Sequence, residues 1–298
     1  MMPMISRTVA AGAAIAGALT VAGLLLAAGG RSGATPADQR PAAAVGEARP
    51  GSLSIALPAA VSDRIYAAPS AIGRPIVVID PGHGGFDPGA TSVSGQVHEK
   101  DLTLALAREL RDALVERGRV RVAMTRDDDR YLTLDERAAV AQRLNASTFV
   151  SVHMDSAPNP LARGATIYSL SDVASDAEAA RAAAAENRGG DAQTGGGSVA
   201  AMLSDLAIRD QMNASAEFAA RVAGKSAGRF ELRPQPHRFA DFHVLRRAGA
   251  PAILFEAGYI SNADDELLLR NPEHRKAIVL ALAQAIEADV ATRSRVES

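Results

Sequence analysis

Two histidines and a glutamate occupy positions at which side chains can do chemistry. His83, His153 and Glu256 each follow a run of apolar, mostly β-branched or aromatic residues. Such runs are typical of strands buried in a sheet. The carboxyl ends of parallel strands meet at one edge of a sheet, where open α/β folds place their ligands. We therefore expect these three side chains to lie close together. Because the chain has no Cys, a metal bound there takes nitrogen and oxygen ligands, which suit zinc.

Glu99 is a further candidate, but the residues alone leave its role open. It precedes a helix with an apolar stripe of leucines every fourth residue from Leu102, which Gly118 ends. A carboxylate at a helix N-terminus is favoured by the helix dipole, so Glu99 is either such a carboxylate or a ligand. Asp87 and Asp155 either hydrogen-bond a ligand histidine or cap a turn. We interpret the remaining histidines as structural or surface residues: His98, His237, His243 and His274.

Strand and helix patterns alternate along the chain. The predicted strands are 76–79, 120–125, 148–153, 165–170 and 252–255. The predicted helices are 102–118, 133–145 with a Thr133–Glu136 capping box, 175–188 with a Ser175–Glu178 capping box, one starting near Ser198, 214–224, and a C-terminal helix that Asn271 caps. This alternation predicts an α/β domain with a mostly parallel central sheet covered by helices on both faces.

The composition and the ends of the chain set the organisation. Arg7 precedes an apolar run, so residues 1–30 resemble a cleaved secretory signal peptide, with an uncleaved membrane anchor as the alternative. Residues 31–72 are rich in Ala, Pro and Gly and are predicted to be a flexible tether, with a weak strand signal at 53–57. One domain follows over 73–293, with a helical insertion at 171–228 and a tail at 294–298. The net charge of −2 argues against a nucleic-acid partner.

Four stretches carry a resemblance to a known family. They are IDPGHGG at 79–85, HEKD at 98–101, SVHMD at 151–155 and FEAGYISN at 255–262. Together and in this order they resemble the zinc-dependent N-acetylmuramoyl-L-alanine amidases of the cell-separation type. The resemblance covers about residues 74–291.

The resemblance implies a role for each matching residue. His83, Glu99 and His153 match the zinc ligands, and Glu256 matches the catalytic glutamate. The implied enzyme is a hydrolase of peptidoglycan that cuts the amide between N-acetylmuramic acid and L-alanine of the stem peptide. In that reaction, zinc activates a water and Glu256 acts as general base and then as general acid. The implied setting is cell-wall remodelling and daughter-cell separation in the periplasm or cell envelope, and the membrane is reached only through an uncleaved N-terminal segment.

The insertion suggests regulation. In some cell-separation amidases a helix in this region blocks the zinc until an activator withdraws it. The segment around Glu186 resembles part of that helix, whereas the Gly-rich run after it departs from the usual pattern. The hypothesis is that Glu186, or alternatively Glu178, occupies the open zinc position, and that a division-associated activator of LytM type is a partner. A solvated helix without a regulatory role is the alternative.

Three other functions fit parts of the pattern. Two histidines and a carboxylate also hold non-haem Fe(II) in oxygenases. A wall-binding module or activator without catalysis would retain the fold, although such proteins usually lose metal ligands and this chain has the complete set. A zinc peptidase would share the site and cut within the stem peptide instead.

Overall fold

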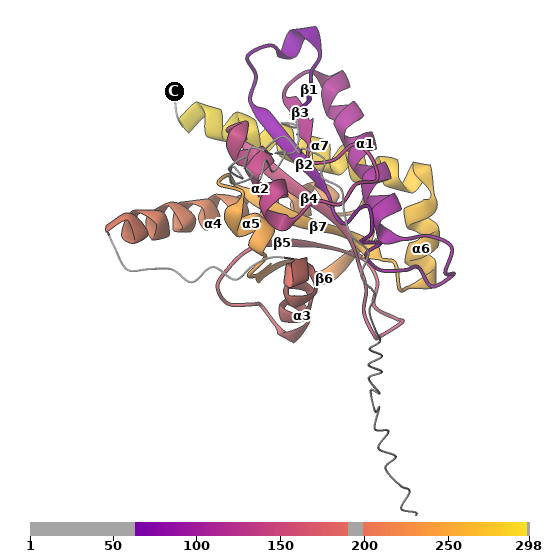
Figure 1. Cartoon of the computed structure of the whole chain (residues 1–298). Helices are drawn as coiled ribbons and strands as arrows, with labels where there is room; N and C mark the ends of the chain where they lie inside the picture. The colour runs from indigo at the N-terminus through magenta and orange to yellow at the C-terminus, as the bar shows by residue number, and fades with distance from the viewer. Residues whose placement is uncertain (1–62, 190–198, 297–298) are drawn as a thin grey trace, which may run out of the picture. The chain divides into compact units, whose positions relative to one another are not determined.

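The computed structural model describes residues 63–189 and 199–296, and within them seven strands form one sheet. The strands are β1 (Ile65–Tyr66), β2 (Ile76–Pro81), β3 (Arg121–Met124), β4 (Thr148–Asp155), β5 (Ala165–Leu170), β6 (Leu232–Ala240) and β7 (Ala252–Tyr259). Their order across the sheet is β1-β3-β2-β4-β7-β5-β6 (Figure 1).

The centre of the sheet is parallel. Strands β3, β2, β4 and β7 run in the same direction, so their carboxyl ends share one edge. At the two sides, β1 is antiparallel to β3 and β5 is antiparallel to β7, while β6 runs parallel to β5. The predicted mostly parallel α/β sheet is therefore confirmed.

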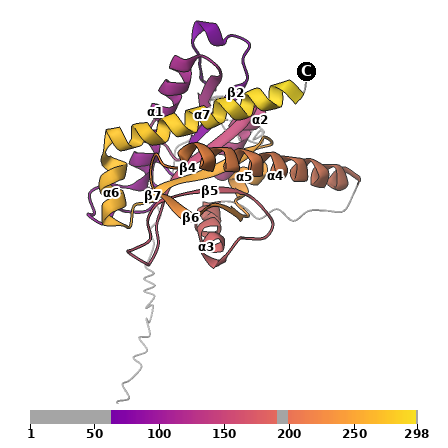
Figure 2. The same ribbon diagram turned by 180° about the vertical axis from the view of Figure 1, so that it is seen from behind.

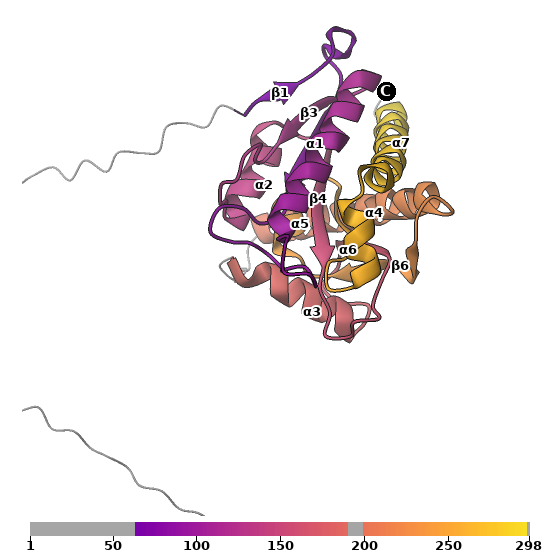
Figure 3. The same cartoon turned by 90° about the vertical axis from the view of Figure 1, so that its right-hand side faces the viewer.

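Helices cover both faces of the sheet. They are α1 (Glu99–Arg117), α2 (Leu134–Arg143), α3 (Ala177–Glu186), α4 (Val199–Ser226), α5 (His243–Arg247), α6 (Ala263–Arg270) and α7 (Pro272–Val296), with short 3-10 turns η1 (Pro69–Ala71) and η2 (Asn187–Gly189). One core joins α1, α4 and α7 to one face, and Figure 2 shows α4 and α7 crossing it. A second core joins α2, α3 and α5 to the opposite face (Figure 3). Alternate residues of β2 enter the two cores, as the pleat of a strand requires.

Several local predictions are confirmed. The leucine stripe of α1 is buried, and Gly118 ends that helix with a φ of 64°. Thr133 and Glu136 form the capping box at the start of α2. Ile278, Leu282 and Ile286 of α7 are fully buried. In each case the signal lies within a few residues of the structure it predicts.

Two boundaries differ from the prediction, the end of β2 and the start of α3. Strand β2 continues to Pro81 instead of stopping before Asp80, because a proline can end a strand through its carbonyl alone. The cap of α3 is Asp176, whose carboxylate accepts from the backbone N–H groups of its first turn. The predicted cap, Ser175, instead accepts from the N–H of Phe239, so no Ser175–Glu178 capping box forms.

The two helices predicted after Ser198 are one continuous helix, α4. Its later part places Phe218, Ala219 and Val222 in the core that α1, α4 and α7 form on one face of the sheet, and α4 packs beside α7 there. The predicted insertion 171–228 therefore divides into α4, whose later part belongs to one core, and α3, whose only buried residues in the other core are Ala179 and Ala183.

Two strands were missed. Strand β1 lies in the segment predicted to be a tether and pairs with β3. Strand β6 contains Pro234 and Pro236, which removed it from a sequence-based strand prediction, but as the edge strand it tolerates missing N–H donors. The predictions for 1–30, 53–57 and the Gly-rich run 190–197 lie outside the described residues. Over the described ranges, none of the helices combines the length and hydropathy needed to cross a bilayer.

Candidate active site

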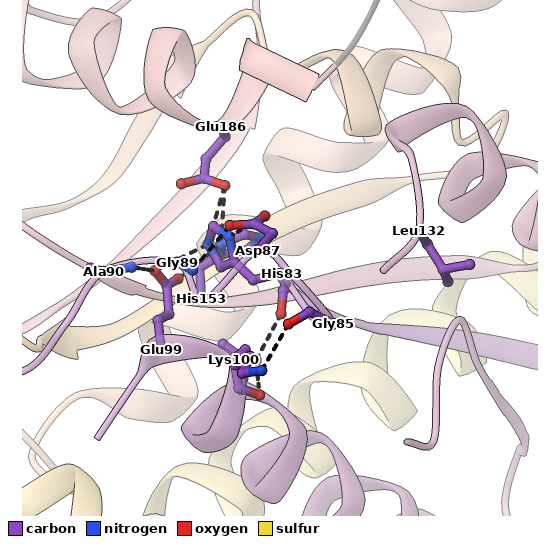
Figure 4. Close-up of polar contacts among 12 residues, drawn as sticks. His83, Gly85, Asp87, Gly89, Ala90, Glu99, Lys100, Leu132, His153 and Glu186 are labelled. Carbon is purple, nitrogen blue, oxygen red and sulfur yellow. Dashed lines mark hydrogen bonds and ion pairs between the residues drawn. The ribbon is translucent and has the colours of Figure 1, made fainter. Parts of the chain in front are cut away.

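The structure brings both histidines together with Glu99 at the carboxyl edge of the parallel strands (Figure 4). Nε2 of His83 lies 3.0 Å from Oε2 of Glu99. Nδ1 of His153 lies 3.1 Å from Oε1 of the same carboxylate. The two imidazole rings are 5.0 Å apart and nearly perpendicular. The three side chains predicted as metal ligands thus face one point, although they come from the loop after β2, the start of α1 and the middle of β4.

A fourth side chain enters from α3. Oε2 of Glu186 lies 3.3 Å from Nδ1 of His153 and 3.7 Å from Nε2 of His83. One ligand atom from each of these three residues lies within 4.8 Å of the other two, which is close enough to share a metal ion. Figure 4 shows Glu186 pointing down from its helix toward the histidines.

Glu99 is held in place by the backbone. Its two oxygens accept hydrogen bonds from the N–H groups of Ala90 at 3.0 Å and of Met154 at 3.0 Å. Gly89 leaves room for this approach, because a Cβ there would lie 2.7 Å from Oε2 of Glu99 and 2.7 Å from the ring of His83. Its φ of +65° also favours glycine. Glu99 therefore points at the histidines rather than into solvent at its helix end.

His83 has a second partner on its other ring nitrogen. Nδ1 hydrogen-bonds to Oδ2 of Asp87 at 2.8 Å, so Asp87 does contact one of the two histidines predicted as ligands. That contact leaves Nε2 for the shared point, where the carboxylates of Glu99 and Glu186 lie 3.0 Å and 3.7 Å away. A carboxylate behind a metal-binding imidazole is the usual arrangement in metalloproteins. The residues therefore fit a metal ion. Asp155, by contrast, bonds the N–H of Ser156 and not a histidine.

Two buried arginines fix the loop that carries His83, and sequence reasoning missed both. Arg137 donates to the carbonyl of Pro81 at 2.7 Å and to that of His83 at 2.7 Å. Arg126 donates to the carbonyls of Pro81 at 3.0 Å and Gly82 at 2.7 Å. Three successive carbonyls are thereby satisfied inside the protein. His83 itself has a φ of 58°, an unfavourable conformation for a histidine, which these contacts help to hold.

Asp80 supplies the negative charge for this arginine pair. One of its oxygens accepts from Arg137 at 2.8 Å and from Thr125 at 2.6 Å, and the other accepts from Ser151 at 2.8 Å. Burial opposes ionisation of Asp80, but the charge of Arg137 and these hydrogen bonds outweigh it and lower the pKa of Asp80. The sequence signal that could have predicted this pair is a polar residue at a buried position. Asp80 lies at the end of a predicted strand, and Arg137 lies on the inner face of α2.

The site favours a positive charge. Burial alone would lower the pKa of His83, but the charge of Glu99 and hydrogen bonds to Asp87 and Glu99 raise it to about 11. Burial would raise the pKa of Glu99, but the two histidines lower it. The carboxylates around this point therefore call for a balancing positive charge. A divalent cation would meet the same need.

Glu256 lies on the strand next to His153. The two residues are directly paired in the register of β4 and β7. Glu256 is 3% exposed, and its Oε2 has no hydrogen-bond partner within the described part of the chain. Burial, together with the charges of Asp155, Glu99 and Glu186, raises its pKa well above the ordinary value. A carboxyl group in this environment is suited to accept and return a proton near neutral pH.

These groups line a cavity of about 740 Å³. Glu256, His83 and His153 lie in its wall, and α3 contributes Glu178 and Glu186. Phe86 and Tyr131 also line it and stack on each other with centroids 4.1 Å apart. Within the described residues, one group of three His, Asp or Glu side chains could hold a metal: His83, His153 and Glu186, all in the wall of this cavity. His98, His237, His243 and His274 do not line it.

Fold and site together define an α/β protein with a candidate mononuclear metal centre at the carboxyl edge of its sheet. Comparison with known proteins is more specific. Residues 77–288 match the Amidase_3 family, described as N-acetylmuramoyl-L-alanine amidase. The match covers well over half of the chain, and the chain belongs to this family.

Individual relatives agree with this assignment. The chain is 32% identical over 220 residues to N-acetylmuramoyl-L-alanine amidase AmiA of Escherichia coli, a match that covers 72% of this chain and 75% of AmiA. It is 33% identical over 219 residues to AmiC of Neisseria meningitidis, covering 72% of this chain and 52% of AmiC, so it spans about half of that relative. Among solved structures, the catalytic domain of CwlV from Bacillus (Paenibacillus) polymyxa var. colistinus matches with a TM-score of 0.52 and 27% identity, covering 71% of this chain and 96% of that domain.

Proposed function

We propose that this protein is a zinc-dependent N-acetylmuramoyl-L-alanine amidase that cleaves the amide between N-acetylmuramic acid and the L-alanine of the peptidoglycan stem. The observation that carries the proposal is the convergence of His83, Glu99 and His153 on one point beside Glu256. Family membership supplies the substrate class. Zinc bound at this point would lower the pKa of water toward about 7 and polarise the scissile carbonyl.

The residues of the chain have separate tasks in this proposal. His83, Glu99 and His153 hold the metal, and Asp87 keeps the ring of His83 turned so that Nε2 faces it. Glu256 takes a proton from the attacking water and delivers it to the leaving nitrogen of L-alanine. The buried position of Glu256 excludes solvent and raises its pKa above the ordinary value, which favours its return of the proton to the leaving nitrogen. Asp80, Arg126 and Arg137 hold the loop still while this happens.

Digestion of purified sacculi by the full chain tests the reaction, with products read by mass spectrometry. Free stem peptides and intact glycan strands are expected, and a zinc chelator should abolish them. Glu256→Gln should lower the rate by about 10²–10⁴-fold, as for loss of a general acid–base, while zinc stoichiometry stays at wild-type level. Products cut within the peptide would replace this proposal with that of a zinc peptidase. Activity that is restored by Fe(II) and not by zinc would identify iron as the metal of the site.

Helix α3 is proposed to be an inhibitory lid, with Glu186 as the residue that fills the open metal position. Glu186 lies within 3.7 Å of both histidine nitrogens. The helix buries little apolar surface of its own, since Ala179 and Ala183 are its buried residues. Asn187, just after it, bonds the carbonyl of Asp241 at 2.7 Å and the N–H of His243 at 2.8 Å. Because α3 is held by polar contacts at its ends more than by a large apolar interface, a partner protein can displace it.

Glu186→Ala tests the lid. Removing this carboxylate should raise basal sacculus hydrolysis by about tenfold or more, because the blocked state loses the contact that stabilises it. Glu217→Ala is the matched control, since it removes an exposed glutamate from the middle of α4. Equal basal rates in wild type and Glu186→Ala would end the lid proposal while leaving the amidase proposal intact.

The proposed location is the periplasm or cell envelope, which residues 1–30 would reach as a signal peptide or anchor. The proposed role is daughter-cell separation, and the proposed partner is a LytM-type activator that withdraws α3. Adding such an activator to wild type should raise hydrolysis to the level of Glu186→Ala and should not raise that variant further. An activator that stimulates both proteins equally would act elsewhere.

A further inference from the structure

Glu178, the other acidic residue of α3 that faces the cavity, lies at a separate position from the metal ligands. Its Oε2 accepts from Nη2 of Arg233 at 2.8 Å and from Nη1 of Arg238 at 3.0 Å. Its Oε1 accepts from the hydroxyl of Tyr259 at 2.7 Å. Three donors from β6 and β7 therefore surround one carboxylate, and Glu178 is not the residue that blocks the metal. We call Arg233, Arg238 and Tyr259 the arginine pocket.

The arginine pocket is built into the sheet rather than into the helix. The side chain of Arg238 is 9% exposed and that of Arg233 is 19% exposed, and Tyr259 is fully buried. The guanidinium of Arg233 also lies 5.3 Å from the ring centre of Tyr259. With α3 in place both guanidinium groups donate to Glu178, so loss of this carboxylate removes a charged partner from each of them.

Withdrawal of α3 would remove Glu178 from the arginine pocket and Glu186 from the metal centre at the same time. Asp176, the cap of α3, is a weaker neighbour of the pocket, with Oδ2 3.7 Å from Nε of Arg238, and it would leave with the helix. The open enzyme would then present two cations and a phenol next to the position of Glu178, which lines the reaction cavity. A ligand with a carboxylate would restore the lost hydrogen bonds.

The spacing matches a short peptide. Glu178 and Glu186 are eight residues apart on α3, which is about 12 Å along a helix. About 12 Å of extended chain corresponds to three or four residues. The carboxyl group on the glycan side of the scissile bond is consumed in that bond, so the free carboxylates of the substrate lie on the peptide side. The pocket therefore lies where a carboxylate early in the stem peptide can reach it.

We propose that Arg233, Arg238 and Tyr259 form a substrate subsite for a stem-peptide carboxylate, and that Glu178 occupies this subsite as an internal mimic while α3 covers the cavity. The proposal rests on the amidase function and on the lid. It assigns the two glutamates of α3 to two positions of the bound substrate: Glu186 to the reacting centre, and Glu178 to the peptide anchor. The lid would then exclude the substrate by imitating it at both points.

The test compares two soluble muramyl peptides, one with free carboxylates and one in which they are converted to carboxamides. The full chain carrying Glu178→Ala is the reference, because it lacks the internal carboxylate. The ratio of kcat/KM for the two substrates is measured in this protein and after adding Arg233→Gln. Any change in the fraction of open enzyme multiplies both values equally, so the ratio reports the subsite alone. Arg209→Gln is the control for loss of one exposed positive charge.

Hydrogen bonds to charged groups predict a preference of about tenfold to a hundredfold for the free carboxylate. Arg233→Gln should reduce this preference to about threefold or less, and Arg209→Gln should not change it. Tyr259→Phe, which keeps the packing of the ring, should reduce it by a smaller factor. Equal kcat/KM values for the two substrates in the reference protein would overturn the subsite, as would a preference that survives Arg233→Gln.

Calorimetric binding of the released peptides separates this inference from the proposed reaction, because it needs no turnover. If the acid binds more tightly than the amide, and Arg233→Gln removes this difference, the subsite is supported even when neither substrate is cleaved. In that case only the amidase proposal fails. Cleavage of both substrates at equal rates, with equal peptide affinities, supports the amidase and refutes the subsite.

Discussion

Arg137→Met tests the buried scaffold under the metal site. The side chain of Arg137 is 4% exposed and that of its partner Asp80 is 1% exposed. The substitution removes hydrogen bonds to Asp80 and to the carbonyls of Leu132, Pro81 and His83. Asp80 would retain only the neutral donors Thr125 and Ser151. Breaking a buried pair in this way costs about 3–5 kcal/mol, a large part of the roughly 5–15 kcal/mol that stabilises a typical domain.

Urea unfolding of the chelated proteins measures this cost without a contribution from metal. Arg143→Met is the matched control on the same helix, because the side chain of Arg143 is 51% exposed in its pair with Asp63. That change should cost about 1 kcal/mol or less. Asp80→Asn and the double variant complete a cycle, and the double variant should be at least about 1 kcal/mol more stable than the sum of the two single costs predicts. Additive costs, or a cost for Arg137→Met no larger than for Arg143→Met, would refute the reasoning.

The pH dependence gives the same pair a second signature. The pKa of Asp80 is lower in the folded protein than its ordinary value of 3.8. A depressed pKa stabilises the fold above the unfolded value and loses that contribution as pH falls through the folded value. The stability difference between wild type and Asp80→Asn should therefore be constant from about pH 7 to 5 and shrink below about pH 4. A difference that is independent of pH down to 3 would contradict the assignment of the charge to Asp80.

Three further predictions concern the metal centre. Asp87→Asn should weaken zinc binding by about 10–100-fold in competition with a chelating dye, because it perturbs the partner of His83 Nδ1; unchanged affinity would remove Asp87 from the site. Gly82→Ala should abolish stoichiometric zinc binding, since its Cβ would lie 2.3 Å from the ring of His153, whereas Gly224→Ala meets nothing within 4 Å and should bind zinc normally. Zinc at a hundred times its Kd should raise the Tm of wild type and of Glu256→Gln equally, by about 5–10 °C; a shift that His153→Ala retains, or that Glu256→Gln loses, would reverse the assignment of ligand and catalytic roles.

The structure also separates two readings that the sequence left open for acidic residues. Glu99 at a helix start could have been a helix-end carboxylate or a ligand, and the structure shows that its carboxylate contacts both histidines. Glu178 and Glu186 were alternatives for one blocking position, and they lie at different positions instead. Such choices depend on which residues approach from β4, β6 and α3, and no local pattern encodes that approach.

The sequence by itself determined the features whose signals are local. Buried strands show as apolar runs, α1 as a leucine stripe ended by Gly118, and α2 as a capping box. The histidines lie at or near the ends of two of these apolar runs. Tertiary structure alone decided the pairing of Asp80 with Arg137, the arginine pocket and the antiparallel run of β5 beside β7. These contacts join residues far apart in the chain. Strand β6 was missed for a related reason: its prolines are tolerated only because the tertiary fold places it at the edge of the sheet.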